Sequence, residues 1–193
     1  MSCKNKFNTI NKREDGFHNI ESIMQTINLF DYLTISVEDN TENQILLSGN
    51  STEIPYNEKN LIYKAGILYL EKTGIKNKKI SVYIDKNIPV SAGLAGGSTN
   101  AAGMLYGLNK LFNEKLSETE LHKLCAVLGS DLNFCLKGGC MMTKGRGEIL
   151  EPSEYNHFTV NLIKPINLGI SAKEAYTKFA QKISQENTGR ENF

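Results

Sequence analysis

The most informative segment of the sequence is Pro89-Val90-Ser91-Ala92-Gly93-Leu94-Ala95-Gly96-Gly97-Ser98-Thr99-Asn100-Ala101-Ala102. Its glycines let backbone N–H groups approach an anion closely, in conformations that side chains forbid. Apolar residues then recur at helical spacing between Ala101 and Phe112. Because the positive end of a helix attracts phosphate, we predict a phosphate-binding loop that leads directly into a helix.

The details of this loop exclude two common nucleotide-binding motifs. A Walker A loop needs Gly-Lys-Ser/Thr, whereas Gly97 is followed by Ser98, and the dinucleotide fingerprint G-x-G-x-x-G is absent. A glycine-rich turn without a ligand is the remaining structural alternative. Ser98 and Thr99 can add hydroxyl contacts to phosphate or Mg²⁺, or they can cap the helix, which is the commoner role.

Strands and one helix are predicted before the loop. Apolar and polar residues alternate over 33–38 and over 80–84, and 45–47 is a short apolar run that ends in turn-forming residues. We expect 33–38 and 45–47 to form a hairpin. Between them and 80–84, helical spacing begins after Asn60, a capping residue, and stops at Gly74.

After the loop, Ser117-x-x-Glu120 is a capping box that predicts a helix ending at Gly129. Residues 134–136 and 140–142 flank Lys137-Gly138-Gly139, which favours a hairpin. Alternation at Phe158, Val160 and Leu162 predicts one more strand, and Ser171-x-x-Glu174 a further helix start. Strands and helices together indicate an α+β fold.

Two further segments carry candidate chemistry. Asp131 follows the helix stop and precedes an apolar segment, so its carboxylate is a candidate base for a hydroxyl that attacks ATP, although aspartate in a Gly-Ser-Asp turn is often only a turn former. Asp15-Gly16 predicts a tight turn that presents Phe17 for stacking on a base and His18 for hydrogen bonding to its edge. An ordinary hairpin with a half-buried phenylalanine explains that turn equally well. His122 and His157 have no evident partner, and we assign them no chemistry.

Composition limits the partners. Lys and Arg number 22 against 21 Asp and Glu, so no strong field directs the chain toward nucleic acid or an anionic membrane, and we predict neither partner. The N-terminus lacks the apolar stretch of a secretory signal, so the four cysteines are predicted to be reduced thiols in the cytoplasm. Cys135 and Cys140 lack a CxxC or histidine partner, so no metal site built from cysteine or histidine is expected, and the sequence leaves open whether a protein group or only ATP holds Mg²⁺.

In combination, these segments resemble the GHMP kinases over about residues 11–171. Lys12-Arg13-Glu14-Asp15-Gly16-Phe17-His18 is similar to the Lys-Arg-x-Asp-Gly-Tyr-His of one branch, whose members phosphorylate a cytidine diphosphate-linked methylerythritol in isoprenoid precursor synthesis. Residues 89–102 resemble the ATP phosphate loop, with Ala95 where glycine is usual. Residues 129–136, with Gly138-Gly139 and Gly145-Arg146-Gly147-Glu148, resemble the segment that carries the catalytic aspartate.

The resemblance implies a fold and a reaction. An N-terminal domain at 1–155, with a sheet and helices related to a ribosomal protein domain, is expected before the start of a second α+β domain at 156–193. ATP with Mg²⁺ would be the donor, Asp131 the base, and Phe17 and His18 the cytidine contacts. The ATP-binding residues would be Pro89, Val90, Ser91, Ala92, Gly93, Leu94, Ala95, Gly96, Gly97, Ser98 and Thr99.

Two departures from the family pattern leave alternatives open. Ser2 stands where members have a catalytic lysine, and the apolar pattern of 3–8 does not fit a buried strand; Lys4 or Lys6 would substitute only if the chain shifts. Members also continue through most of a second domain, so we expect a chain truncated at both ends. The alternatives are a non-catalytic nucleotide-binding fragment, or a GHMP kinase of the mevalonate, homoserine or galactose type, against which the Asp-Gly-Phe-His turn argues. Kinship with the ribosomal domain suggests a nucleic-acid module only by analogy.

Overall fold

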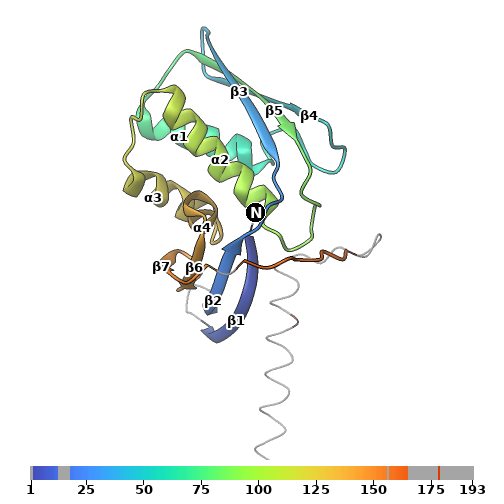
Figure 1. Cartoon of the computed structure of the whole chain (residues 1–193). Helices are drawn as coiled ribbons and strands as arrows, with labels where there is room; N and C mark the ends of the chain where they lie inside the picture. Colours follow the sequence, from blue (N-terminus) through green and yellow to red (C-terminus); the bar gives the residue numbers. More distant parts are fainter. Residues whose placement is uncertain (1, 13–17, 156, 165–177, 179–193) are drawn as a thin grey trace, which may run out of the picture. The chain divides into compact units, whose positions relative to one another are not determined.

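The structure is a computed structural model that describes residues 2–12, 18–155, 157–164 and 178 (Figure 1). The chain divides into two compact units, one made of 1–90 and 94–157, the other of 91–93 and 158–193. The helices and strands of the first unit are, in chain order, β1 (Ser2–Lys12), β2 (His18–Thr26), β3 (Tyr32–Asp39), β4 (Gln44–Gly49), α1 (Leu61–Thr73), β5 (Lys78–Asp85), α2 (Gly96–Leu111), α3 (Glu118–Leu128), α4 (Leu132–Lys137), β6 (Cys140–Lys144) and β7 (Ile149–Pro152).

The smaller sheet has the strand order β3-β5-β4. β3 runs antiparallel to β5, and β4 runs parallel to β5 because α1 carries the chain back across the sheet. The hairpin predicted for 33–38 and 45–47 is therefore wrong, since β5 lies between these strands. β5 takes the centre because its alternate residues Ile80, Val82 and Ile84 are fully buried.

The larger sheet has the order β1-β2-β6-β7, and all its neighbours are antiparallel. Residues 3–8, whose pattern does not fit a buried strand, lie in β1 at the edge of this sheet. An edge strand tolerates irregular pairing, and the register of β1 with β2 shifts between Lys4 and Lys6 and again between Thr9 and Asn11.

The two helices with capping signals form as predicted. Asn60 Oδ1 accepts the Ile62 N–H at 2.9 Å, and α1 ends at Gly74 in the left-handed region, with φ 67°. Ser117 and Glu120 form the complete capping box of α3, which stops at Gly129. A capping side chain marks the start of each helix, and a glycine marks its end.

Two strand predictions after α3 are wrong. Residues 132–137 form α4 instead of one arm of a hairpin, and β6 pairs with β2 and β7. The helical turn buries Leu132 and Phe134 and ends at Gly138, which has φ 69°. Residues 157–164 contain neither helix nor strand, and Phe158 and Leu162 are exposed, so this segment has no buried face to favour a strand. The helix predicted from Ser171 lies outside the described residues.

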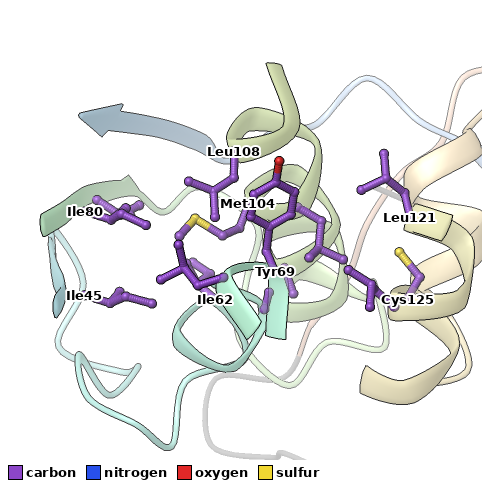
Figure 2. Packing of buried hydrophobic residues seen from close by; sticks show 14 of the residues in the cluster. Ile45, Ile62, Tyr69, Ile80, Met104, Leu108, Leu121 and Cys125 are labelled. Carbon is purple, nitrogen blue, oxygen red and sulfur yellow. The ribbon is translucent and has the colours of Figure 1, made fainter. Parts of the chain in front are cut away.

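The core lies between the smaller sheet and the helices. In Figure 2, Ile45 of β4 and Ile80 of β5 face side chains of α1 and α2, and α3 closes the far side with Leu121 and Cys125. Burial, together with the nearby Cys135, raises the pKa of the Cys125 thiol to about 12. Within the part of the chain that the structure describes, no helix is long and apolar enough to span a bilayer.

Candidate functional site

The glycine-rich loop leads into α2, as predicted, but the helix begins earlier than its hydroxyl residues suggested. α2 starts at Gly96 with Ala95 as its N-cap, and Ala95 makes no side-chain capping hydrogen bond. Ser98 and Thr99 lie inside the first turn, so the interpretation that they cap the helix is wrong. The first N–H groups of a helix have no intrahelical acceptor, and here the N-cap side chain supplies none. This end of α2 is therefore suited to an anion.

The two glycines at the start of α2 have different surroundings. A Cβ on Gly96 would lie 3.0 Å from Ile88 Cγ2 and 3.3 Å from Lys86 Nζ, so a side chain would disturb the packing there. A Cβ on Gly97 would meet Leu61 Cδ1 at 3.8 Å, and Gly97 is exposed. Gly96 thus serves packing, whereas Gly97 leaves room for a ligand to approach the backbone.

Other predicted ATP-binding residues are placed as follows. Pro89 is exposed, and Val90 and Leu94 are half-buried in the first unit. Ser91, Ala92 and Gly93 belong to the second unit, and Gly93 has a positive φ of 70°, a conformation that glycine permits.

Thr99 connects the start of α2 with α4. Its Oγ1 donates to the carbonyl of Ala95 at 3.0 Å and lies 3.4 Å from Cys135 Sγ. Thr99 therefore holds the local structure, and Ser98 is the hydroxyl at this helix end that remains a candidate ligand.

Asp131 is the residue before α4. The sequence suggested an apolar strand beside it, but it is the N-cap of α4, with φ −86° and ψ −11° and without a side-chain capping bond. Its carbonyl accepts the Cys135 N–H at 3.0 Å, which closes one helical turn, about 5.4 Å along the axis. Because Cys135 contacts Thr99, Asp131 lies about one turn of α4 from the residues that touch the start of α2.

The segment 145–148 packs against the residues just before α4, next to Asp131. Gly147 has φ 120°, and a Cβ there would lie 3.1 Å from the carbonyl oxygen of Ser130, the neighbour of Asp131. Gly145 accepts the Ile20 N–H at 2.8 Å, two residues after His18. His18 begins β2, whereas Phe17 and the predicted Asp15-Gly16 turn lie outside the described residues. The backbone start of β2 and Asp131 are thus joined through one glycine-rich loop.

His122 has a partner that the sequence did not reveal. Its Nδ1 lies 3.0 Å from Oδ1 of the buried Asn133, whose amide reaches the Glu148 carbonyl at 3.5 Å. These contacts join α3, which carries His122, to α4, which carries Asn133. The interpretation that His122 lacks a nearby partner is therefore wrong.

Asp31 is a buried carboxylate that sequence reasoning missed. Its side chain has no accessible surface and pairs with Lys86 at 2.9 Å. Burial by itself raises the pKa of Asp31, but hydrogen bonds, the first from the Ile88 N–H, outweigh this effect and leave the pKa below its usual value. Its position directly before β3 was the available signal, but its partners are more than 50 residues away.

No group of three or more histidine, cysteine or carboxylate side chains that could hold a metal ion occurs among the described residues.

Comparisons with known proteins agree with this geometry. Residues 60–141 match the GHMP kinases N terminal domain. A relative from Clostridium perfringens (strain SM101 / Type A) is 42% identical over 169 residues, which are 87% of this chain and 57% of the relative. One from Prochlorococcus marinus (strain MIT 9215) is 42% identical over 175 residues, 90% of this chain and 55% of the relative. Both are named 4-diphosphocytidyl-2-C-methyl-D-erythritol kinase, and this chain spans little more than half their length.

A solved structure of a kinase with an equivalent name is also similar to this chain. The crystal structure of 4-(cytidine 5'-diphospho)-2C-methyl-D-erythritol kinase has a TM-score of 0.65 and 31% sequence identity, covering 79% of this chain and 52% of that one. With the loop, helix and sheet arrangement above, these matches show that the chain contains a GHMP kinase N-terminal domain over residues 60–141.

Proposed function

We propose that this chain supplies the ATP phosphate loop and the catalytic base of a kinase that phosphorylates a hydroxyl of 4-diphosphocytidyl-2-C-methyl-D-erythritol, a step of isoprenoid precursor synthesis. The observation that carries the proposal is the Thr99–Cys135 contact of 3.4 Å, because it holds the anion-suited end of α2 beside the helix that Asp131 begins. The two relatives support the choice of acceptor, since both carry this name. We assign the ATP-binding domain to residues 1–155 and the start of a second domain to 156–193.

In this reaction the acceptor hydroxyl attacks the γ-phosphorus of ATP. A new O–P bond forms, the bond from the γ-phosphorus to the β,γ-bridging oxygen breaks, and ADP leaves with that electron pair. Asp131 takes the hydroxyl proton as the attack proceeds. The N–H groups of the first turn of α2 donate hydrogen bonds to phosphate oxygens, and the exposed Gly97 lets these oxygens approach the backbone.

Mg²⁺ is assigned to the ATP phosphates, with the Ser98 hydroxyl as a protein ligand. Thr99 is less suited, because its hydroxyl already bonds the Ala95 carbonyl. Bound to ATP, the ion would neutralise charge that develops on the transferred phosphoryl group. For the cytidine we propose stacking on Phe17 and hydrogen bonding to His18, at the start of β2.

The test is phosphate transfer by the whole chain, with Mg²⁺ and ATP, to 4-diphosphocytidyl-2-C-methyl-D-erythritol. Homoserine and mevalonate serve as alternative acceptors. We expect turnover with the cytidine compound and none with homoserine or mevalonate. In Asp131→Asn, the rate of phosphate transfer should fall by at least about 10²-fold. Asp39→Asn is the matched control, because Asp39 is an exposed carboxylate at the end of β3, and its activity should match wild type.

Titration of each ligand by calorimetry accompanies the assay. A chain that binds neither ATP nor the cytidine compound contradicts the proposal, and a chain that prefers homoserine or mevalonate contradicts the choice of acceptor. Binding of ATP without turnover would favour the second candidate, a non-catalytic nucleotide-binding protein.

A further inference from the structure

The carboxylate of Asp31 accepts hydrogen bonds from residues on both sides of the phosphate loop. Its Oδ1 accepts the N–H groups of Asn87 and Ile88, each at 2.7 Å, just after β5. Its Oδ2 accepts the Asn100 amide at 2.8 Å, from the second turn of α2. A single buried side chain therefore binds the residues that precede the loop and a residue that follows it.

Lys86 also binds Asp31, and it lies next to the start of α2; with Asn87, Ile88 and Asn100 these residues form the Asp31 cluster. Its Nζ lies 2.9 Å from Asp31 Oδ2 and also donates to the Ile88 carbonyl. Only 6% of the Lys86 side chain is exposed. Because a Cβ on Gly96 would lie 3.3 Å from this amine, Lys86 packs directly against the first residue of α2.

The cluster needs a carboxylate because four donors converge on one side chain. An ionised carboxylate has two acceptor oxygens with about four lone-pair sites, whereas an asparagine amide offers one acceptor oxygen and directs its own donors at the rest. Lys86 and Asn100 would then face an NH₂ group. A buried ion pair of this kind adds little net stability, but loss of one partner leaves a buried charge unpaired.

The same contacts fix the two ends of the loop, at Ile88 and at Gly96. Ile88 is held through both its N–H and its carbonyl, and its side chain packs against Gly96. The entry to the loop and the start of α2 are thus fixed to each other before any ligand arrives. A site held in its binding geometry loses less conformational freedom when the ligand binds.

We propose that Asp31 is a positioning residue for the ATP phosphates: through Ile88, Lys86 and Asn100 it fixes the start of α2 in the geometry that binds ATP. The role in ATP binding rests on the function proposed above. Because the Asp31 side chain has no accessible surface, it would act through these residues and contact neither the phosphates nor the acceptor. Its effect is therefore specific to ATP and leaves the affinity for the cytidine compound unchanged.

The test compares Asp31→Asn with Asp85→Asn in the whole chain. Asp85 is a fair control, because it lies one residue before Lys86 and also accepts a side-chain amide, from Asn50 at 2.7 Å. In Asp31→Asn we expect the KM and the Kd for MgATP to rise about 10- to 100-fold while the acceptor KM stays within about twofold. Amide hydrogen exchange at Ile88, without nucleotide, should accelerate at least about 10-fold. Asp85→Asn should match wild type in all these measurements.

A second variant covers the case in which Asp31→Asn does not fold. Asn100→Ala removes one donor and leaves the ion pair in place, and it should raise the KM for MgATP about 3- to 10-fold without changing the acceptor KM. Unchanged ATP affinity in a folded variant, or equal losses for ATP and acceptor, would overturn the inference and leave the proposed function intact. If wild type binds no ATP, the proposed function fails, and the exchange rate at Ile88 still decides whether Asp31 holds the loop.

Discussion

Thr99 Oγ1 lies 3.4 Å from Cys135 Sγ and joins the first turn of α2 to the helix that Asp131 begins. Thr99→Val keeps the volume of the side chain but removes this contact and the bond to the Ala95 carbonyl. We expect the free energy of unfolding to fall by about 1 kcal/mol and turnover to fall about 10-fold, since the phosphate end and the base lose their alignment.

The measurement pairs chemical unfolding with the transfer assay. Thr34→Val is the control, because Thr34 is exposed on β3 and should tolerate the same change. If Thr99→Val is destabilised but keeps full turnover, the contact serves only the fold.

Ala95 adopts φ 55° and ψ 30° at the start of α2, a left-handed conformation that disfavours residues with a Cβ. This geometry favours the glycine that the resemblance to the family leads us to expect at this position. Ala95→Gly should therefore raise the free energy of unfolding by about 0.5–1 kcal/mol, the strain relief being partly offset by the freer unfolded chain.

The comparison is Ala101→Gly, in the buried part of the same helix. That change should lower stability by at least about 1 kcal/mol, because glycine is unfavourable inside a helix. Both values come from urea unfolding, and a loss of stability in Ala95→Gly would contradict the strain at position 95.

The elements predicted correctly are those with local signals. Asn60 and Gly74 bound α1, and Ser117 and Glu120 open α3, because a capping bond joins residues that are two or three apart. The glycine-rich loop and its helix are also local. Asp131 came from the resemblance to a family motif, and its role as the base stays a prediction. Phe17 lies outside the described residues, so its cytidine contact stays a prediction.

The errors concern contacts between distant residues and short apolar runs. Nothing local in 45–47 indicates that β4 pairs with β5, some 35 residues later, instead of β3. Residues 134–136 are too short for periodicity to distinguish a strand from a turn of helix. The role of Asp31 was equally hidden, since its four donors come from Asn87, Ile88, Lys86 and Asn100.

Cys125 and Cys135 differ in reactivity although they lie near each other. Cys125 is fully buried, and burial raises its pKa to about 12, whereas Cys135 is partly exposed. The thiolate is the form that alkylates, so iodoacetamide at pH 8 should modify Cys135 well before Cys125. Peptide mass spectrometry measures both sites, and labelling in urea, where the two thiols should react alike, is the control. Equal rates in the folded chain would contradict the burial of Cys125.

The buried carboxylate of Asp31 should make stability depend on pH in acid. Its pKa is lowered from the ordinary value of 3.8, because the hydrogen bonds from Ile88 and the other donors outweigh its burial. A carboxyl group with a lower pKa in the folded state stabilises the fold above the unfolded pKa, and this contribution disappears as the pH falls through the folded pKa. The difference in unfolding free energy between wild type and Asp31→Asn should therefore be constant from pH 7 to about 5 and shrink below pH 3.8. Urea unfolding at each pH measures it, with Asp85→Asn as reference. A difference that persists unchanged into strong acid would mean that the volume and hydrogen bonds of Asp31, rather than its charge, hold the start of α2.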